Sequence, residues 1–232
     1  DSVATIHDRE CAADSRLREE LCYDWYPRRA FIDHFFNDSS TLDGFCRSSF
    51  EELGDFVLND YSVKQIEYNQ PGVVLERKGQ VRANQRDYPL QITKSFVFKE
   101  GAIEADYKLL SLASEPLQIK FGVECNLAMP ANCGPGGKYY LNGEMPSEHS
   151  FLSQDETVGV SEVKLADDVI GGVVSFSWSR PTTFWRFPLQ TVSQSEAGWE
   201  KTYQSSVLMP FWALNLSPGE EWQVRLSLGV SV

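Results

Sequence analysis

Alternating apolar and polar residues dominate the chain after Phe50 and predict β-strands. The clearest runs have an apolar residue at every second position and cover 103–109, 119–127, 174–178 and 222–230. Successive side chains of a strand point to opposite faces of a sheet, so each run has one buried face. Turn sequences such as Gln70-Pro71-Gly72 separate the runs. The pattern predicts an all-β fold, a large antiparallel β-sandwich with twelve or more strands.

A helical pattern occurs only near the start of the chain. Residues 8–21 are rich in Arg, Glu, Ala and Leu, with Leu17 and Leu21 four positions apart. These residues favour helices, so we expect a short N-terminal helical lead-in. A chain of 232 residues can bury a single large core, and no long linker interrupts it. We therefore divide it into a lead-in of residues 1–22 and one β-sandwich domain of residues 23–232.

The densest mixture of aromatic and charged residues is the segment Tyr23–Phe36. Six of its fourteen residues are aromatic and five more are charged or titratable. Aromatic rings favour burial, whereas the charged groups need water or partners. The segment could be a platform on which sugar rings stack, a seam against another domain, or a core edge with solvated charges. The residues alone leave these three interpretations open.

The strand predicted at 119–127 has an unusual outer face. If its apolar residues point into the core, the opposite face carries Lys120, Gly122, Glu124 and Asn126. Polar groups in mid-strand could line a concave ligand-binding surface, or they could be an ordinary solvated face. Trp185 is a further candidate, because the neighbouring Arg186 makes simple core packing less certain.

Composition narrows the range of partners. The formal net charge is −12, which argues against nucleic acid and anionic membranes but leaves neutral ligands such as sugars open. The five cysteines show no CxxC pair and the three histidines are far apart, so we expect free thiols, as in the cytoplasm, and no metal site. No apolar run reaches the length of a membrane span or a signal peptide.

Several blocks of sequence carry a resemblance to a known family. In chain order they are Tyr23-Asp24-Trp25-Tyr26-Pro27-Arg28, Phe31-Ile32-Asp33-His34-Phe35, Leu53-Gly54-Asp55-Phe56, Tyr88-Pro89-Leu90 and Phe121-Gly122-Val123-Glu124-Cys125-Asn126-Leu127. Their order and spacing resemble the C-terminal domain of α-amylases and 4-α-glucanotransferases of glycoside hydrolase family 57.

The resemblance implies a galactose-mutarotase-like β-sandwich that follows a catalytic (β/α) barrel in a cytoplasmic α-glucan-acting enzyme. In that family the paired carboxylates of catalysis come from the barrel, so no catalytic residue and no cofactor is expected here. Residues 1–22 would link to the catalytic domain. The first residue is Asp1 rather than methionine, and we expect the chain to be one piece of a longer protein. The implied partners are that barrel and an α-glucan or maltooligosaccharide.

Two groups of candidate site residues follow. For sugar hydroxyl groups the candidates are Glu124, Asn126 and Trp185. For stacking or domain contact they are Tyr23, Trp25, Tyr26, Arg28, Asp33 and His34.

Two other function classes stay open. One is an aldose 1-epimerase-like enzyme, in which His34 or His149 would act as the acid and Glu124 as the base. The other is a scaffold that only supports a partner domain.

Overall fold

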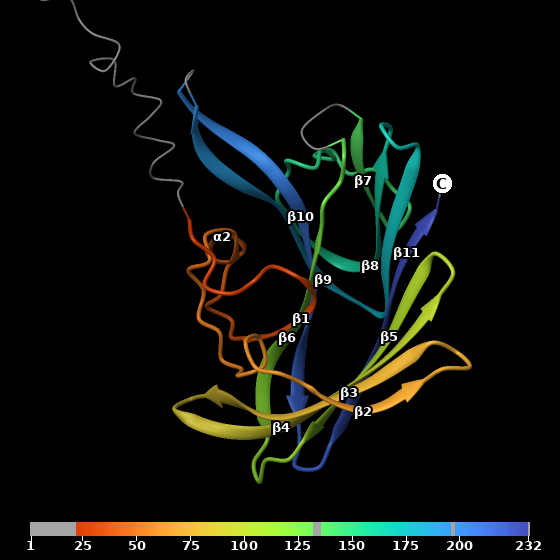
Figure 1. The fold of residues 1–232 in the computed structure, drawn as a ribbon. Coiled ribbons are helices and arrows are strands. Elements are labelled where there is room, and N and C mark those ends of the chain that lie inside the picture. Colours follow the sequence, from red (N-terminus) through yellow and green to blue (C-terminus); the bar gives the residue numbers. More distant parts are fainter. Residues whose placement is uncertain (1–21, 132–135, 196–197, 232) are drawn as a thin grey trace, which may run out of the picture.

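The computed structural model describes residues 22–131, 136–195 and 198–231, and almost all of its regular structure is β-strand (Figure 1). The elements are β1 (Ala30–Phe36), α2 (Leu42–Cys46), β2 (Ser62–Glu67), β3 (Gly72–Ala83), β4 (Arg86–Lys99), β5 (Ala102–Ser111), β6 (Leu117–Leu127), β7 (Gly137–Leu141), β8 (Asp155–Asp167), β9 (Gly172–Ser195), β10 (Gly198–Leu216) and β11 (Glu221–Ser231). The helix expected at 8–21 lies outside the described residues.

The strands form one antiparallel sheet in the order β1-β6-β10-β9-β11-β5-β4-β3-β2, and β8 joins β9 to β7. The predicted antiparallel all-β architecture is confirmed. The described residues contain eleven strands instead of twelve or more. The difference arises because β9 and β10 are continuous strands of 24 and 19 residues, each of which contains more than one alternating run.

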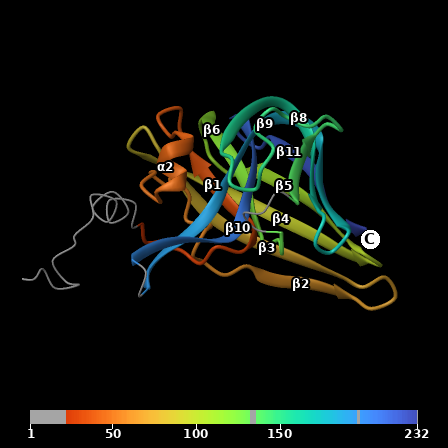
Figure 2. The same ribbon diagram turned by 90° about the horizontal axis from the view of Figure 1, so that it is seen from above.

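The sheet folds over on itself, and its main core lies between the two halves (Figure 2). Phe121 on β6 contacts the ring of Tyr107 on β5 at 6.1 Å, although four strand positions separate them in the sheet. Phe121 also contacts Trp222 of β11 at 5.8 Å. The inward phase predicted for 119–127 is correct, since Val123 and Cys125 are fully buried in this core.

A second, smaller apolar cluster lies on the other face of β1, β6, β9 and β10. Its buried members are Phe36, Phe45, Trp185, Phe187, Val207, Met209 and Phe211. The short helix α2 contributes Phe45, whose ring stacks on Phe50 at 3.7 Å. Thr41 caps this helix, because its hydroxyl accepts a hydrogen bond from the Gly44 amide at 3.1 Å. The segment around α2 therefore covers an outer sheet face that would otherwise meet water.

Two smaller observations concern the setting of the chain. Cys22, Cys46 and Cys125 are free thiols, while Cys11 and Cys133 lie outside the described residues. Within the described ranges, no helix is long and apolar enough to cross a membrane.

Candidate functional site

The pairing of β1 with β6 brings most of the predicted site residues together. In the strand register, His34 on β1 pairs with Gly122 on β6. Glu124 lies two residues further along β6 and so faces the same side of the sheet. That face points away from the main core toward segment 22–29 and α2. Gly122 leaves little room for a side chain at this position, because a Cβ atom would lie 3.2 Å from the ring of Phe36.

Glu124 is the centre of a buried polar group. Its Oε2 accepts hydrogen bonds from the Tyr26 hydroxyl at 2.7 Å and from Arg28 Nη1 at 3.2 Å, and it lies 3.0 Å from His34 Nε2. Its Oε1 accepts from Asn126 Nδ2 at 2.7 Å. Together with Glu52 these residues form what we call the Glu124 cluster. Five of its six members, all but Glu52, are sequence-predicted site residues.

Glu52 completes the cluster and was missed by the sequence reasoning. Its Oε2 lies 2.7 Å from His34 Nδ1, and its Oε1 accepts from the amides of Phe35 at 2.7 Å and Gly54 at 3.0 Å. Glu52 precedes the block Leu53-Gly54-Asp55-Phe56 that carried the family resemblance. It lies outside any strand, so no alternation marks it.

The cluster shifts the pKa values of its members in opposite directions. Burial alone would lower the pKa of His34, but its bonds to Glu124 and Glu52 outweigh burial and raise that pKa to about 9. Burial alone would raise the pKa of Glu124, but His34 and Arg28 lower it to about 2. Burial raises the pKa of Glu52. A protonated His34 is thus held between two carboxylates.

Arg28 fastens the covering segment to the sheet. Its guanidinium reaches Glu124 on β6, and its Nε donates to Asp24 Oδ1 at 2.8 Å. Its Nη2 donates to the hydroxyl of Ser48 at 2.9 Å and to the carbonyl of Phe45 at 3.3 Å. One side chain therefore ties segment 22–29, α2 and β6 together.

The exposed position predicted for Glu124 is wrong, and the one predicted for Asn126 holds only in part. Glu124 has no exposed surface and Asn126 is only partly exposed. The alternation was interpreted correctly, but the outer face is covered by segment 22–29 and α2. All four protein donors of Glu124 are in place, so no sugar hydroxyl can reach this carboxylate in the folded protein.

The epimerase alternative fails on accessibility. His34 and Glu124 do lie within hydrogen-bond distance, but both have no exposed surface, so no substrate reaches them. His149 is elsewhere, with Nδ1 3.2 Å from the carbonyl of Ser147. An acid and a base that act on a sugar ring must both touch it.

Asp33 lies on the opposite face of β1, in a second buried ion pair. Its Oδ2 lies 2.5 Å from Lys94 Nζ and accepts a hydrogen bond from the Tyr61 hydroxyl. Lys94 also donates to the carbonyl of Phe31 at 2.9 Å. Phe31 has a φ of 59°, a left-handed backbone that is unusual for an aromatic residue, at the bulge where β1 meets β6. Lys94 and Tyr61 were not predicted from the sequence.

Only two residues of the predicted contact group face solvent. Tyr23 is 85% exposed and Trp25 40% exposed, whereas Tyr26, Asp33 and His34 are buried. Trp25 packs its ring on Tyr26 at 4.6 Å. The prediction of an outward-facing stacking or contact role is therefore wrong for the buried members. Arg28 is also largely covered, with 5% of its side chain exposed.

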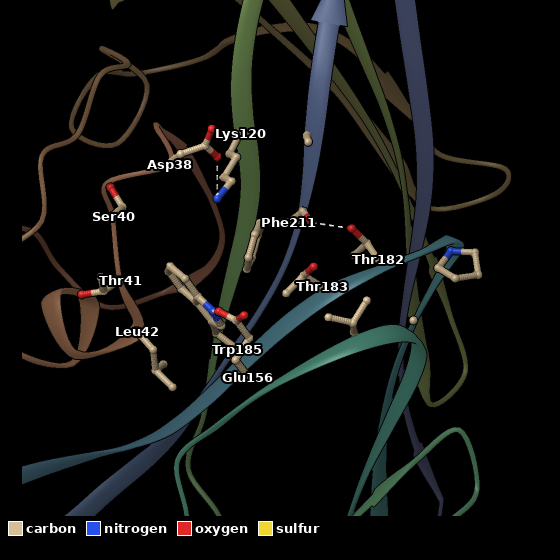
Figure 3. A pocket seen from close by; sticks show the side chains of 14 residues that line it. Asp38, Ser40, Thr41, Leu42, Lys120, Glu156, Thr182, Thr183, Trp185 and Phe211 are labelled. Carbon is tan, nitrogen blue, oxygen red and sulfur yellow. Dashed lines mark hydrogen bonds and ion pairs between the residues drawn. The ribbon is translucent and has the colours of Figure 1, made fainter.

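Trp185 is 2% exposed and belongs to the second apolar cluster. Its ring stacks near Phe36 at 5.6 Å and contacts Phe211 at 4.7 Å. Its indole Nε1 donates to Glu156 at the edge of an open hollow (Figure 3). The ring offers no free face for a sugar to stack on, so any contact with sugar would run through Glu156.

The described residues hold no group of three or more His, Cys, Asp or Glu side chains arranged to bind a metal ion. The Glu124 cluster is internally neutralised by hydrogen bonds and opposite charges. Its chemistry is that of a buried clamp, because charged groups removed from water need such partners.

Comparison with known proteins assigns this chain to a family. The family described as "Alpha-amylase/4-alpha-glucanotransferase, C-terminal" matches residues 1–226. The chain belongs to this family. It is 32% identical over 200 residues to the 4-alpha-glucanotransferase of Thermococcus litoralis and 31% identical over 188 residues to the alpha-amylase of Pyrococcus horikoshii. The aligned parts cover 86% and 81% of this chain but only 27% and 25% of those proteins.

Solved structures agree with this assignment. The crystal structure of the Thermococcus litoralis 4-alpha-glucanotransferase aligns with 96% of this chain and 30% of its own, at 29% identity and a TM-score of 0.74. A galactose mutarotase-like protein from Clostridium acetobutylicum aligns with 97% of this chain and 83% of its own, at a TM-score of 0.55 and 10% identity. The second match shows the fold alone. The expected galactose-mutarotase-like sandwich is confirmed.

Proposed function

We propose that this chain is the non-catalytic C-terminal domain of an enzyme that hydrolyses or transfers α-1,4-glucan, and that it docks on the catalytic part of the same protein. The observation that supports this most is the family match over residues 1–226, combined with coverage of about a quarter of the related enzymes. The Glu124 cluster supports the non-catalytic role, because its two carboxylates, those of Glu124 and Glu52, are hydrogen-bonded to other groups of the chain. The free thiols fit a cytoplasmic setting.

The docking surface that we propose is the exposed part of segment 22–29. Segment 22–29 begins the part of the chain that the structure describes, and in a C-terminal domain the rest of the protein precedes that segment. Tyr23 and Trp25 expose aromatic surface there, and aromatic residues are enriched in the centres of interfaces. Arg28 and Tyr26 hold the segment against β6, so these rings are presented on a rigid support.

The chain alone should neither hydrolyse nor transfer α-1,4-glucan. In the Glu124 cluster the carboxylate of Glu124 has no exposed surface and the side chain of Glu52 is 8% exposed, whereas retaining glycosidases need two carboxyl groups about 5 Å apart around the bond that is cleaved. The assay is incubation of the purified chain with maltoheptaose, followed by chromatography of the products. Shorter or longer oligosaccharides formed at a rate proportional to the concentration of the chain would refute the proposal.

Replacing Trp25 with alanine should weaken docking of the chain on the separately produced catalytic part by about tenfold in Kd, as expected for one aromatic anchor. The measurement is titration calorimetry with both proteins. Tyr68→Ala is the matched control, because Tyr68 is 84% exposed and follows β2 at the far edge of the sheet. Equal affinities for the two folded variants would remove Trp25 from the interface.

A further inference from the structure

An open hollow of about 570 Å³ lies beside the second apolar cluster, away from the Glu124 cluster. Five parts of the chain line it: the loop before α2, β6, the start of β8, the middle of β9, and β10 (Figure 3). Its volume falls within the range of about 300–1,000 Å³ that is common for small-ligand sites. The chain segments that form it are far apart in sequence.

The charges of the hollow disfavour an anionic ligand. Lys120 is its one cationic side chain and is paired with Asp38, Nζ to Oδ1, at 2.9 Å. Glu156 adds a second carboxylate, so the lining carries two negative charges and one positive charge. Phosphate or carboxylate groups would meet net repulsion there. An uncharged ligand with many hydroxyl groups has no such penalty.

Polar groups on the rim remain available for a ligand. Glu156 Oε2 accepts from the indole of Trp185, which orients the carboxylate and leaves Oε1 without a partner among the described residues. The hydroxyls of Ser40 and Thr183 likewise make no hydrogen bond within the described part of the chain. One fixed acceptor and two rotatable hydroxyls suit a sugar, whose hydroxyl groups both donate and accept.

We propose that this hollow binds a short stretch of α-1,4-glucan, with Glu156 Oε1 and the Thr183 hydroxyl as its main hydrogen-bonding groups. Trp185 is a positioning residue that holds the Glu156 carboxylate. The choice of α-glucan rests on the proposed function. The site itself rests on the charge balance and the unpartnered groups of the lining. Its occupation would hold glucan on the domain without any chemistry.

Titration calorimetry of the chain with maltoheptaose tests the proposal. Binding to the unaltered chain is expected. Glu156→Gln keeps an oxygen for the Trp185 indole but replaces the free acceptor by a donor, and it should weaken binding by about tenfold, the loss of one hydrogen bond to a charged group. Thr183→Val, which keeps the shape and removes the hydroxyl, should weaken it about threefold or more. Both variants should keep the circular dichroism spectrum of the unaltered chain.

Gln223→Ala is the control, because Gln223 lines a different hollow of about 640 Å³ on the face of β4, β5 and β11. Gln223→Ala should leave binding unchanged, and the proposal is overturned if maltoheptaose does not bind or if Glu156→Gln and Thr183→Val both leave its binding unchanged. The proposed docking surface, segment 22–29, contributes no residue to the lining of the hollow. Loss of sugar binding with docking intact therefore refutes the hollow alone, whereas absence of docking refutes the proposed function.

Discussion

Replacing Glu124 with glutamine should lower the free energy of unfolding by about 3–5 kcal/mol, the usual cost of removing one partner from a buried ion pair. The substitution leaves the charges of His34 and Arg28 inside the protein without their shared carboxylate. Glu124 has no exposed surface, so water cannot replace the lost acceptor. An exposed sheet position, as the sequence predicted for this residue, would instead change stability by no more than about 0.5 kcal/mol.

Urea unfolding followed by tryptophan fluorescence measures this difference. Glu144→Gln is the control, because Glu144 is an exposed glutamate and its substitution should change stability by less than about 0.5 kcal/mol. A loss below about 1 kcal/mol for Glu124→Gln would mean that the carboxylate is not the centre of a buried charge cluster.

The protein should lose stability as the pH rises from about 6.5 to about 9. The pKa of His34 is raised to about 9 in the folded chain from an ordinary value near 6.5. The folded state therefore holds this proton more tightly, and the stabilisation is fully present below pH 6.5 and lost as the pH passes 9. The difference corresponds to on the order of 3 kcal/mol. The raised pKa of Glu52 acts in the same direction at lower pH.

Glu124 determines how the free energy of unfolding changes at low pH. Its pKa is lowered to about 2, so its contribution is present above pH 4.5 and is lost as the pH falls through 2. Unfolding free energies measured from pH 2 to pH 10 test both the loss of stability at high pH and the loss at low pH, and a nuclear magnetic resonance titration of His34 reports its pKa directly. A pKa of His34 at or below 6.5 would contradict the conclusion that Glu124 and Glu52 hold this side chain in its protonated form.

The sequence predicted the sheet better than it predicted the site. The alternation of apolar and polar residues correctly predicted which side chains of β6 point into the main core. Val123 and Cys125 are buried there because they lie on the inward face of the strand, and the sequence pattern alone identifies that face. It could not show that segment 22–29 and α2 cover the other face. That covering depends on contacts between positions about a hundred residues apart, such as the one between Tyr26 and Glu124. Residues of one strand cannot reveal them.

The same limit explains the residues that were missed. Glu52 and Tyr61 lie outside regular strands, and Lys94 occupies an inward position of β4 that favours an apolar residue. Lys94 is tolerated there because Asp33 and the carbonyl of Phe31 meet its ammonium group. The density of aromatic and charged residues in Tyr23–Phe36 did indicate an unusual segment. It did not indicate which of its side chains turn inward.

Hydrogen exchange of the chain with and without the catalytic part of its protein tests the central claim most directly. Tyr26 and Arg28 hold residues 22–29 through their side chains, but the backbone of this segment lies outside helices and strands, so its amides should exchange faster in the free chain than those of the sheet. The account predicts that the catalytic part slows exchange in 22–29 and leaves β3 and β4 unchanged. Slower exchange in β3 and β4 with no change in 22–29, or no change anywhere, would contradict it.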